Sequence, residues 1–505
     1  MKKTALYLLV GLVLACVSTS CNKDEQTQGF RATTEGCGDK TSLAADGLTI
    51  NWSAGDQILI AGSGNGASSY TSGYIYQVSS GAGTTNAEFT YAGPGSEPMM
   101  HEPYAAYYPA SAWNFVSGNY PYVFVYIPPI QTYVEGGMVG FPMATYSNDR
   151  NLYFKNVCGV LKIHATKANT NISRIVITTD EEINGSSGVE ESSVSSNVPF
   201  VREGSGYTTT LMCPTPQSID NGRDFYIYVN WNGSPWSFFE IKLYTDDNRV
   251  CTKVANTEIR VNRSQITTIN LPESSLTFED IPSYTRPDGA IGHPFRINQA
   301  GREVYFSQGN LQYINGTWGF AAHQYDYLDS YSEMAWDLFG WSTTTNNFGM
   351  STSTNTADYT GTFVDWGTNI GDGHTWYTLS PSEWNYIRSH NVSGSATITI
   401  DGQNIHGLVI LPNDWAGASI NINRSSWNDN TYTAATWTTM EAGGAIFLPA
   451  AGDREGTRLL NRGSWSLIWT NSPTSWMEFS PSSLSIRTGC DARHGFSVRL
   501  VCDAQ

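Results

Sequence analysis

The sequence changes character near residue 272, and this change predicts a chain built from two unlike halves. All nine lysines lie at or before Lys253, whereas twelve of the sixteen tryptophans follow residue 300. Between these regions, residues 272–294 carry four prolines among Glu, Ser, Asp and Gly, which is typical of a linker of limited flexibility. A length of 505 residues is also sufficient for two or three domains.

The first half is a series of strand signals without long helical stripes. Apolar runs alternate with turn residues, so we predict strands at 57–60, 122–127, 160–165, 174–178, 225–231, 239–244 and 266–271. This pattern favours an antiparallel β-sandwich, and the fold class of the whole chain is predicted to be mainly β.

Four short motifs in this half resemble the fimbrillin-like proteins, also called type V pilins. They are WSAGDQI at 52–58, YAAYYP at 104–109, IPPIQ at 127–131 and NVCGVLKI at 156–163. The resemblance implies a lipoprotein precursor of a pilus subunit with two β-sandwich modules. It also implies that an arginine-specific protease removes a leading strand, and that a neighbouring subunit donates a strand into the groove. Arg31 stands at about the matching place for this cleavage, although an ordinary exposed arginine in a flexible leader is an equal alternative.

The second half, from about residue 289, mixes strands with short helices. Ser380, Pro381 and Glu383 form a helix start, with Ser380 as the N-cap, and a second short helix is predicted at 437–443. The motifs FSQGNL at 306–311, DLFGW at 337–341, FLPAAG at 447–452 and GFSVRL at 495–500 resemble the C-type-lectin fold shared with formylglycine-generating enzymes. The resemblance implies a compact α+β ligand-binding domain.

The N-terminal residues predict export. Lys2 and Lys3 precede an apolar run at 5–15 that is too short to span a membrane. Cys16 or Cys21 could accept lipid, and we favour Cys21. The Asn-Lys-Asp-Glu sequence after it resembles the tag of Gram-negative lipoproteins at the outer face of the outer membrane. The predicted organisation is a signal peptide with its lipid-accepting cysteine at 1–21, a fimbrillin-like region at 22–271, a linker at 272–294 and a lectin-like domain at 295–505.

The net charge and the spacing of motifs argue against several classes of function. A net charge of −17 argues against nucleic acid and anionic membrane surfaces, so a lipid anchor is the expected membrane contact. Metal-ligand spacings and a nucleophile elbow are missing from the sequence, and we predict neither an enzyme nor a cofactor. Calcium is an alternative at Asp365 or Asp429, although the companion triplet of calcium-dependent lectins is missing. The six cysteines of the mature chain are predicted to be mostly buried or unpaired.

The segment 464–494 lies between two framework motifs and keeps neither helical nor strand period. We therefore predict an exposed, irregular recognition surface, with Trp465, Trp469 and Trp476 as candidates for exposure. The predicted ligand-binding residues are Ser464, Trp465, Ser466, Leu467, Ile468, Asn471, Ser485, Arg487, Thr488, Cys490, Asp491 and His494.

The end of this segment has one further property. Every residue from Ser480 to His494 can be encoded by a codon ending in a pyrimidine, as adenine-directed mutagenesis of asparagine codons would leave. This resembles the variable region of proteins that diversity-generating retroelements alter on the lectin fold. Chance also explains so short a run in a chain poor in lysine.

These features predict an exported lipoprotein of a Gram-negative bacterium that acts as a pilus-tip adhesin at the cell surface. Its partners would be other pilin subunits and a host or bacterial surface glycan or protein. The alternative is a surface lipoprotein that captures glycans and never polymerises.

The lipid-accepting cysteine can be identified by substitution. Cys21→Ala should abolish incorporation of radiolabelled palmitate, because Cys21 follows small residues and precedes the charged tag. Cys16→Ala is the matched control and should retain labelling, and the reverse pattern would show that Cys16 is the acceptor.

Overall fold

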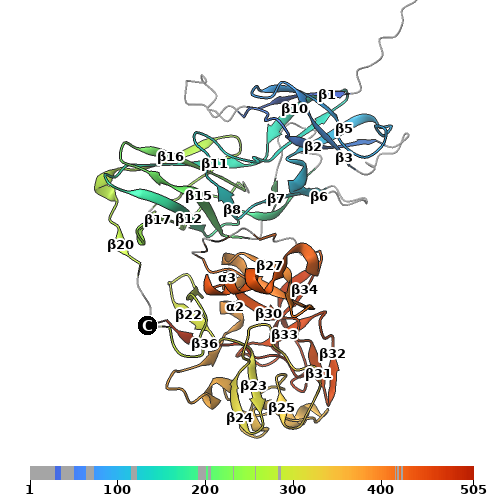
Figure 1. The fold of residues 1–505 in the computed structure, drawn as a ribbon, viewed down its shortest axis with the longest axis vertical. Coiled ribbons are helices and arrows are strands. Elements are labelled where there is room, and N and C mark those ends of the chain that lie inside the picture. The colour runs from blue at the N-terminus through green and yellow to red at the C-terminus, as the bar shows by residue number, and fades with distance from the viewer. Residues whose placement is uncertain are drawn as a thin grey trace, which may run out of the picture.

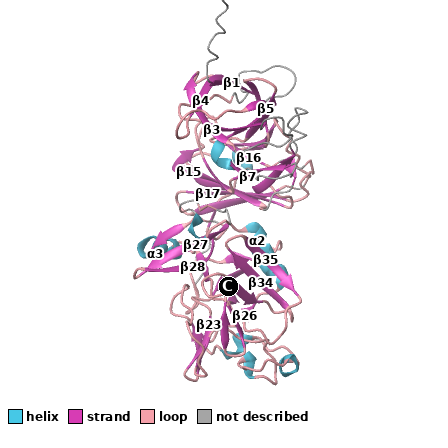
Figure 2. Ribbon diagram, turned by 90° about the vertical axis from the view of Figure 1, so that its right-hand side faces the viewer, coloured by secondary structure: helices cyan, strands magenta, loops and turns pink. Residues whose placement is uncertain are grey.

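The computed structural model describes residues 29–35, 50–63, 73–114, 122–190, 201–202, 206–230, 233–255, 257–281, 286–413, 415, 417, 420–421 and 425–504. These residues form a mainly β protein, as the sequence predicted. Two β modules and the second half follow one another along the long axis (Figures 1 and 2). Cys16 and Cys21 lie outside the described residues. Within the described part, no helix has the length and apolar character needed to cross a membrane.

The first module is a closed barrel. In order around the barrel, its strands are β1 (Gly29–Thr34), β10 (Asn151–Asn156), β9 (Met143–Ser147), β5 (His101–Tyr108), β2 (Gln57–Ser63), β3 (Tyr74–Ser80) and β4 (Asn86–Tyr91). The barrel closes because β1 pairs antiparallel with β4 and parallel with β10. Inside, the buried Trp52 meets Phe89 edge-on at 5.0 Å between ring centroids. This module thus forms a closed barrel, where the sequence predicted an antiparallel sandwich.

A small sheet and a true sandwich complete the first half. The small sheet contains β6 (Trp113–Asn114), β7 (Tyr122–Ile127), β13 (Gly185–Glu190) and β14 (Val201–Arg202). One sandwich sheet contains β16 (Arg223–Val229), β11 (Gly159–Ala165) and β19 (Ile266–Leu271). The other contains β20 (Glu279–Asp280), β18 (Arg249–Val254), β17 (Phe239–Thr245), β12 (Asn171–Thr179), β15 (Thr208–Ser218) and β8 (Ile130–Thr132). Ile163, Ile175 and Ile227 are fully buried between these two sheets, so the second module is a sandwich as predicted.

The segment predicted as a linker packs against both halves. Leu276 is buried in the core of the sandwich, and β20 extends its larger sheet by pairing with β18. Ala290 and Ile291 are buried in the second half. Apolar side chains therefore anchor this proline-containing connection on either side of the undescribed residues 282–285.

The second half is a set of small sheets with two short helices, α2 (Pro381–His390) and α3 (Ala434–Ala442). Both predicted helices are present, although α3 begins at Ala434 and not at the predicted residue 437, and Ser380 and Glu383 form the predicted capping box on α2. The strands of the first three sheets are β21 (Phe295–Arg296), β22 (Glu303–Phe306), β36 (Leu500–Asp503) and β26 (Tyr377–Thr378); β24 (Thr317–Phe320), β23 (Leu311–Ile314) and β25 (Ala335–Trp336); and β29 (Thr431–Thr433), β27 (Ser393–Ile400), β28 (Gln403–Ile410) and β30 (Ile446–Pro449). A hairpin of β31 (Asp453–Glu455) and β32 (Arg458–Leu460) follows.

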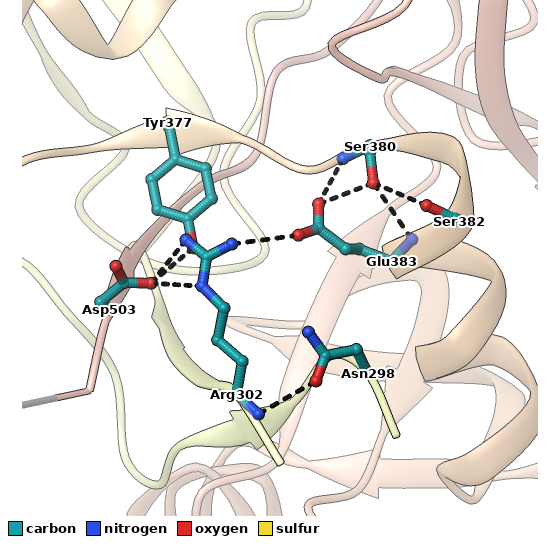
Figure 3. Close-up of polar contacts among 7 residues, drawn as sticks. All are labelled: Asn298, Arg302, Tyr377, Ser380, Ser382, Glu383 and Asp503. Atoms are coloured by element: carbon teal, nitrogen blue, oxygen red, sulfur yellow. Dashed lines mark hydrogen bonds and ion pairs between the residues drawn. The ribbon is translucent and has the colours of Figure 1, made fainter. Parts of the chain in front are cut away.

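Arg302 ties the beginning and the end of the second half together (Figure 3). Its guanidinium donates to Oδ1 of Asp503 at 2.9 and 3.1 Å, and to the hydroxyl of Tyr377 at 2.8 Å. A longer contact of 3.4 Å reaches Oε1 of Glu383, whose other carboxylate oxygen accepts from the N-cap Ser380. This cluster, the Arg302 clamp, joins the ends of β22 and β36 to β26 and to the start of α2.

The closing segment of the second half should be intolerant of truncation. Phe496 is buried, with its ring 4.5 Å from that of Trp469, and it exchanges two backbone hydrogen bonds with Phe339. Phe496→Ala should lower the free energy of unfolding by about 3–5 kcal/mol, because it leaves a cavity. Urea denaturation followed by tryptophan fluorescence measures this loss. Val139→Ala, at a position 60% exposed, is the control and should change stability by about 0.5 kcal/mol or less. Equal effects of the two substitutions would contradict the burial.

Candidate ligand-binding site

The segment predicted as an irregular loop is a three-stranded antiparallel sheet, and that prediction was wrong. Its strands are β33 (Ser466–Trp469), β34 (Ser475–Ser480) and β35 (Ser483–Thr488), which we call the tail sheet. Short turns at 470–474 and 481–482 join the strands. The segment 495–498 runs beside β33, where Ser497 donates to Leu467 and accepts from Trp469. The predicted binding residues therefore lie on a scaffold with a defined register.

The tail sheet packs one of its faces against the core. Met477, Phe479 and Leu484 pack there with Ile468 and with Trp384 of α2. Because side chains alternate between the two faces of a strand, Ile468 points into the core and not toward a ligand. Ser466 and Ile468 are each 0% exposed, which corrects the prediction that both belong to an exposed surface.

The opposite face of the tail sheet carries the side chains that a ligand could contact. Cross-strand pairing aligns Leu467 with Glu478 and Ser485, and Trp469 with Trp476 and Arg487. Trp469 is fully buried beneath Phe496, so its predicted exposure is wrong. The partly or largely exposed side chains of this row are Leu467, Trp476, Ser485 and Arg487.

A charged and aromatic cluster occupies this outer face. The Nε of Arg487 donates to Oε1 of Glu478 at 2.8 Å, and the indole Nε1 of Trp476 donates to Oε2 at 3.2 Å. Glu478 is only 8% exposed, whereas the Arg487 side chain is 53% exposed. The buried carboxylate thus fixes the orientation of a cation and an indole at the surface, and both groups can contact a polar or planar ligand.

Asp491 and Arg493 extend this face toward a neighbouring loop. Asp491 accepts from the hydroxyl of Thr356 at 2.6 Å and from the guanidinium of Arg493 at 2.9 Å. Arg493 also pairs with Glu455 at 3.1 Å and donates to the carbonyl of Thr354 at 3.1 Å. Burial raises the pKa of Asp491, but the hydrogen bonds and the Arg493 charge outweigh it, so the pKa lies below its ordinary value. Asp491 is therefore a structural anchor as well as a partly exposed group.

The other predicted residues fall in three places. Thr488 and Asn471 are exposed at the same end of the tail sheet, where β35 ends and the β33–β34 turn begins. Cys490 and His494 are half-buried beside them, and burial raises the pKa of the Cys490 thiol to about 12. Ser464 and Trp465 are exposed at the opposite end of β33, so the structure does not bring them together with Thr488.

The cysteines behave as the sequence suggested. Among the described cysteines, Cys213, Cys251, Cys490 and Cys502 form no disulfide, and Cys158, Cys213, Cys251 and Cys502 are buried. Burial raises the pKa of Cys502, like that of Cys490, to about 12. Thiols with such values are poorly nucleophilic at neutral pH.

The two carboxylates considered as calcium ligands already accept hydrogen bonds from nearby residues. Asp429 accepts from the backbone amides of Ser425 and Ser426 and caps a short 3-10 turn. Asp365 likewise accepts from Gly367 and Thr378. Among the described residues, no group of three His, Cys, Asp or Glu side chains is placed to hold a metal ion. Local capping explains these two motifs without a cation.

Sequence reasoning missed the residues that support the outer face. Glu478, Arg493, Thr354 and Thr356 position the predicted residues, and Glu478 lies between Trp476 and Arg487. A usable signal was present, because the turn sequences NSPT at 471–474 and SPS at 480–482 bound the six-residue strand β34.

Comparisons with known proteins give only distant likenesses. No family model and no curated protein matches this sequence. A solved structure of a candidate cell adhesion protein from Bacteroides ovatus is 10% identical, with a TM-score of 0.36, over 50% of this chain and 95% of that one. A fimbrial protein from Bacteroides ovatus is 9% identical, with a TM-score of 0.25, over 94% of this chain and 99% of that one. The tip fimbrial protein Mfa3 from Porphyromonas gingivalis is 12% identical, with a TM-score of 0.25, over 46% and 97%. These values assign neither fold nor function, and the lectin-like character of the second half stays a prediction.

The anchoring role of Asp491 predicts a pH-dependent stability difference. A carboxylate whose folded pKa is lowered stabilises the protein above its unfolded pKa of about 3.9, and this contribution disappears as the pH falls through the folded value. Asp491→Asn should therefore lower the melting temperature at pH 7, and the difference from the unaltered protein should shrink below about pH 4. Thermal unfolding at a series of pH values between pH 7 and below about pH 4 measures this difference in melting temperature. The control Thr488→Ala should alter stability by about 0.5 kcal/mol or less. A deficit for Asp491→Asn that is constant with pH would contradict the assignment.

Proposed function

We propose that this chain is a pilus-tip adhesin at the surface of a Gram-negative bacterium. Its first half would enter the fibre by strand exchange, and its second half would bind a glycan or protein through the outer face of the tail sheet. The observation that carries the proposal is an asymmetry between two strands. Both β1 and β36 are paired on both edges, but β1 carries an exposed arginine at which a protease could cut, whereas β36 carries none.

β1 supports the role of strand acceptor. Arg31 lies within β1, its side chain is 71% exposed, and it contacts Glu88 at 3.4 Å. Its backbone amide donates to the carbonyl of Arg150, so β1 must leave the barrel before or during cleavage. Cleavage after Arg31 would detach Gly29–Arg31, the first half of β1, and would expose the backbone edges of β4 and β10 that pair with it, which an added strand from another subunit could complete.

β36 supports the terminal position in the fibre. Val501 pairs with Phe306 of β22 on one side and with Tyr377 of β26 on the other. Val501 is fully buried, and Asp503 is held by the Arg302 clamp. A strand paired on both edges is not available to a neighbouring subunit, so this chain would accept a strand and donate none from β36.

The outer face of the tail sheet suits a binding role without catalysis. Trp476 and Arg487 offer a planar ring and a cation, and Ser485 adds a hydroxyl from the same face. We also propose that Ser485, Arg487, Thr488, Asp491 and His494 are the diversified positions, because each of these residue types can be encoded by a codon ending in a pyrimidine.

Fractionation of sheared pili tests the proposal. Arg31→Ala should remain in the membrane fraction and be missing from pili, because β1 would stay in the barrel. Arg249→Ala removes a partly exposed arginine of the second module and, as the control, should enter pili normally. Mass spectrometry of pilus-bound protein should show cleavage after Arg31. An intact N-terminus in pili, or normal assembly of Arg31→Ala, would contradict strand exchange. Membrane-bound protein that never enters pili would favour the glycan-capturing lipoprotein.

A further inference from the structure

The two halves meet where the sandwich faces α2 and β21 (Figure 1). Tyr207, which precedes β15, stacks on His390 of α2 with 5.0 Å between ring centroids, and its backbone amide donates to the carbonyl of Ser389 at 3.2 Å. Glu240 of β17 pairs with Arg296 of β21 at 3.2 Å, and both side chains are mostly buried. A cleft of about 1060 Å³ borders these contacts, and Arg296 is part of its lining. Solvent in this cleft therefore lies next to the residues that join the halves.

His390 is enclosed between two aromatic rings, one from each half. Tyr386, one turn earlier on α2, stacks on it with 3.8 Å between ring centroids and 9° between the ring planes. The ring of Tyr207 from the first half is also nearly parallel to it, at 18°. Two rings stacked this closely cannot share one face, so the tyrosines cover opposite faces of the imidazole. Separation of the halves would remove Tyr207 and expose one face of His390 to water.

The imidazole of His390 is neutral in this arrangement. Its Nδ1 lies 2.9 Å from the carbonyl of Tyr386, which can only accept, so Nδ1 carries the proton and a second proton would go to Nε2. Burial lowers the pKa of His390 to about 4; the carbonyl of Tyr386 acts against this shift, and the charge of Arg296 adds to it. An exposed histidine has a pKa of about 6.5. The ring therefore takes up a proton more readily in water than at the junction.

The charged groups around the junction offer no counter-ion to a protonated ring. These groups are Arg296 and Arg388 from the second half, and Glu181, Glu182 and Glu240 from the first. Glu182 accepts from the hydroxyl of Tyr207 at 3.3 Å, and Glu240 is paired with Arg296. No described carboxylate forms an ion pair with His390. An imidazolium at this place would lose part of its hydration without gaining an ionic partner.

We propose that His390 makes the junction between the two halves sensitive to pH. At neutral pH the uncharged ring fits between the two tyrosines and holds the halves together. Acidification favours the separated state, in which water can hydrate the charged ring, so the second half is released from the sandwich. Because the separated state binds the extra proton, separation increases as the pH falls from about 6.5 and levels off below about 4. This device depends neither on strand exchange nor on the ligand of the tail sheet.

Hydrogen exchange of the Tyr207 amide tests the proposal, because this amide is released when Tyr207 leaves Ser389. Its protection, corrected for the intrinsic exchange rate at each pH, should fall about 30-fold between pH 7.5 and pH 5.0. This is the change expected when the pKa moves from about 4 to about 6.5 on separation. Mass spectrometry with single-residue fragmentation of the purified chain measures it. His390→Gln, whose side chain does not titrate, should show equal protection at both pH values within about twofold.

Two substitutions and one amide serve as controls. His164→Gln replaces a histidine of β11 outside the junction, and Glu240→Gln breaks the ion pair with Arg296. Both variants should retain the fall of about 30-fold, because His390 still titrates in them. The amide of Trp236, which donates to the carbonyl of Ile259 within the sandwich, should keep its protection at both pH values.

Several results would overturn the proposal. They are protection of Tyr207 that is constant with pH, an equal fall in His390→Gln, and a fall that disappears in Glu240→Gln, which would assign the effect to the ion pair. An equal loss of protection at Trp236 would assign the change to general unfolding and would overturn it as well.

Discussion

The fold of the second half depends on one pairing between segments that are far apart in the sequence. This is the pairing of β36 with β22, which the Arg302 clamp reinforces. β22 lies near the start of this half and β36 near the end of the described chain, so the contact closes the sequence on itself. β36 continues the segment 495–498, which aligns β33 and covers Trp469. The position of the tail sheet thus follows from the closure. The contacts of Asp503, Tyr377 and Glu383 with one guanidinium make that closure specific in register.

Local signals explain what the sequence could predict. β7 and β19 have the predicted bounds, and α2 begins at its predicted cap. Each depends on residues close together in the chain, such as the reciprocal bonds between Ser380 and Glu383. Closure of the barrel depends instead on the pairing of β1 with β10, for which no local pattern exists.

The tail sheet shows why a strand can escape detection. A strand with one solvent face alternates between apolar and polar residues, but one covered on both faces does not. In β34, Met477 and Phe479 enter one core while Trp476 packs against another, and Glu478 is buried beneath Arg487. The sequence therefore resembles an irregular loop. Arg487 and Thr488 were correctly predicted to be exposed, whereas Ser466 and Ile468 could be excluded only once the register was known.

The same topology determines how the second half would carry a mechanical load. The covalent route from the tail sheet to the first half runs back through most of this half. The hydrogen-bonded route crosses only β33, the segment 495–498, β36 and β22. A pull applied at Arg487 would reach the first half mainly through these few pairings and through the ion pair of Arg302 with Asp503. The force that this half can withstand would therefore be determined by the strand pairs nearest its junction with the first half. The longer covalent connection would carry load only after those pairs had separated.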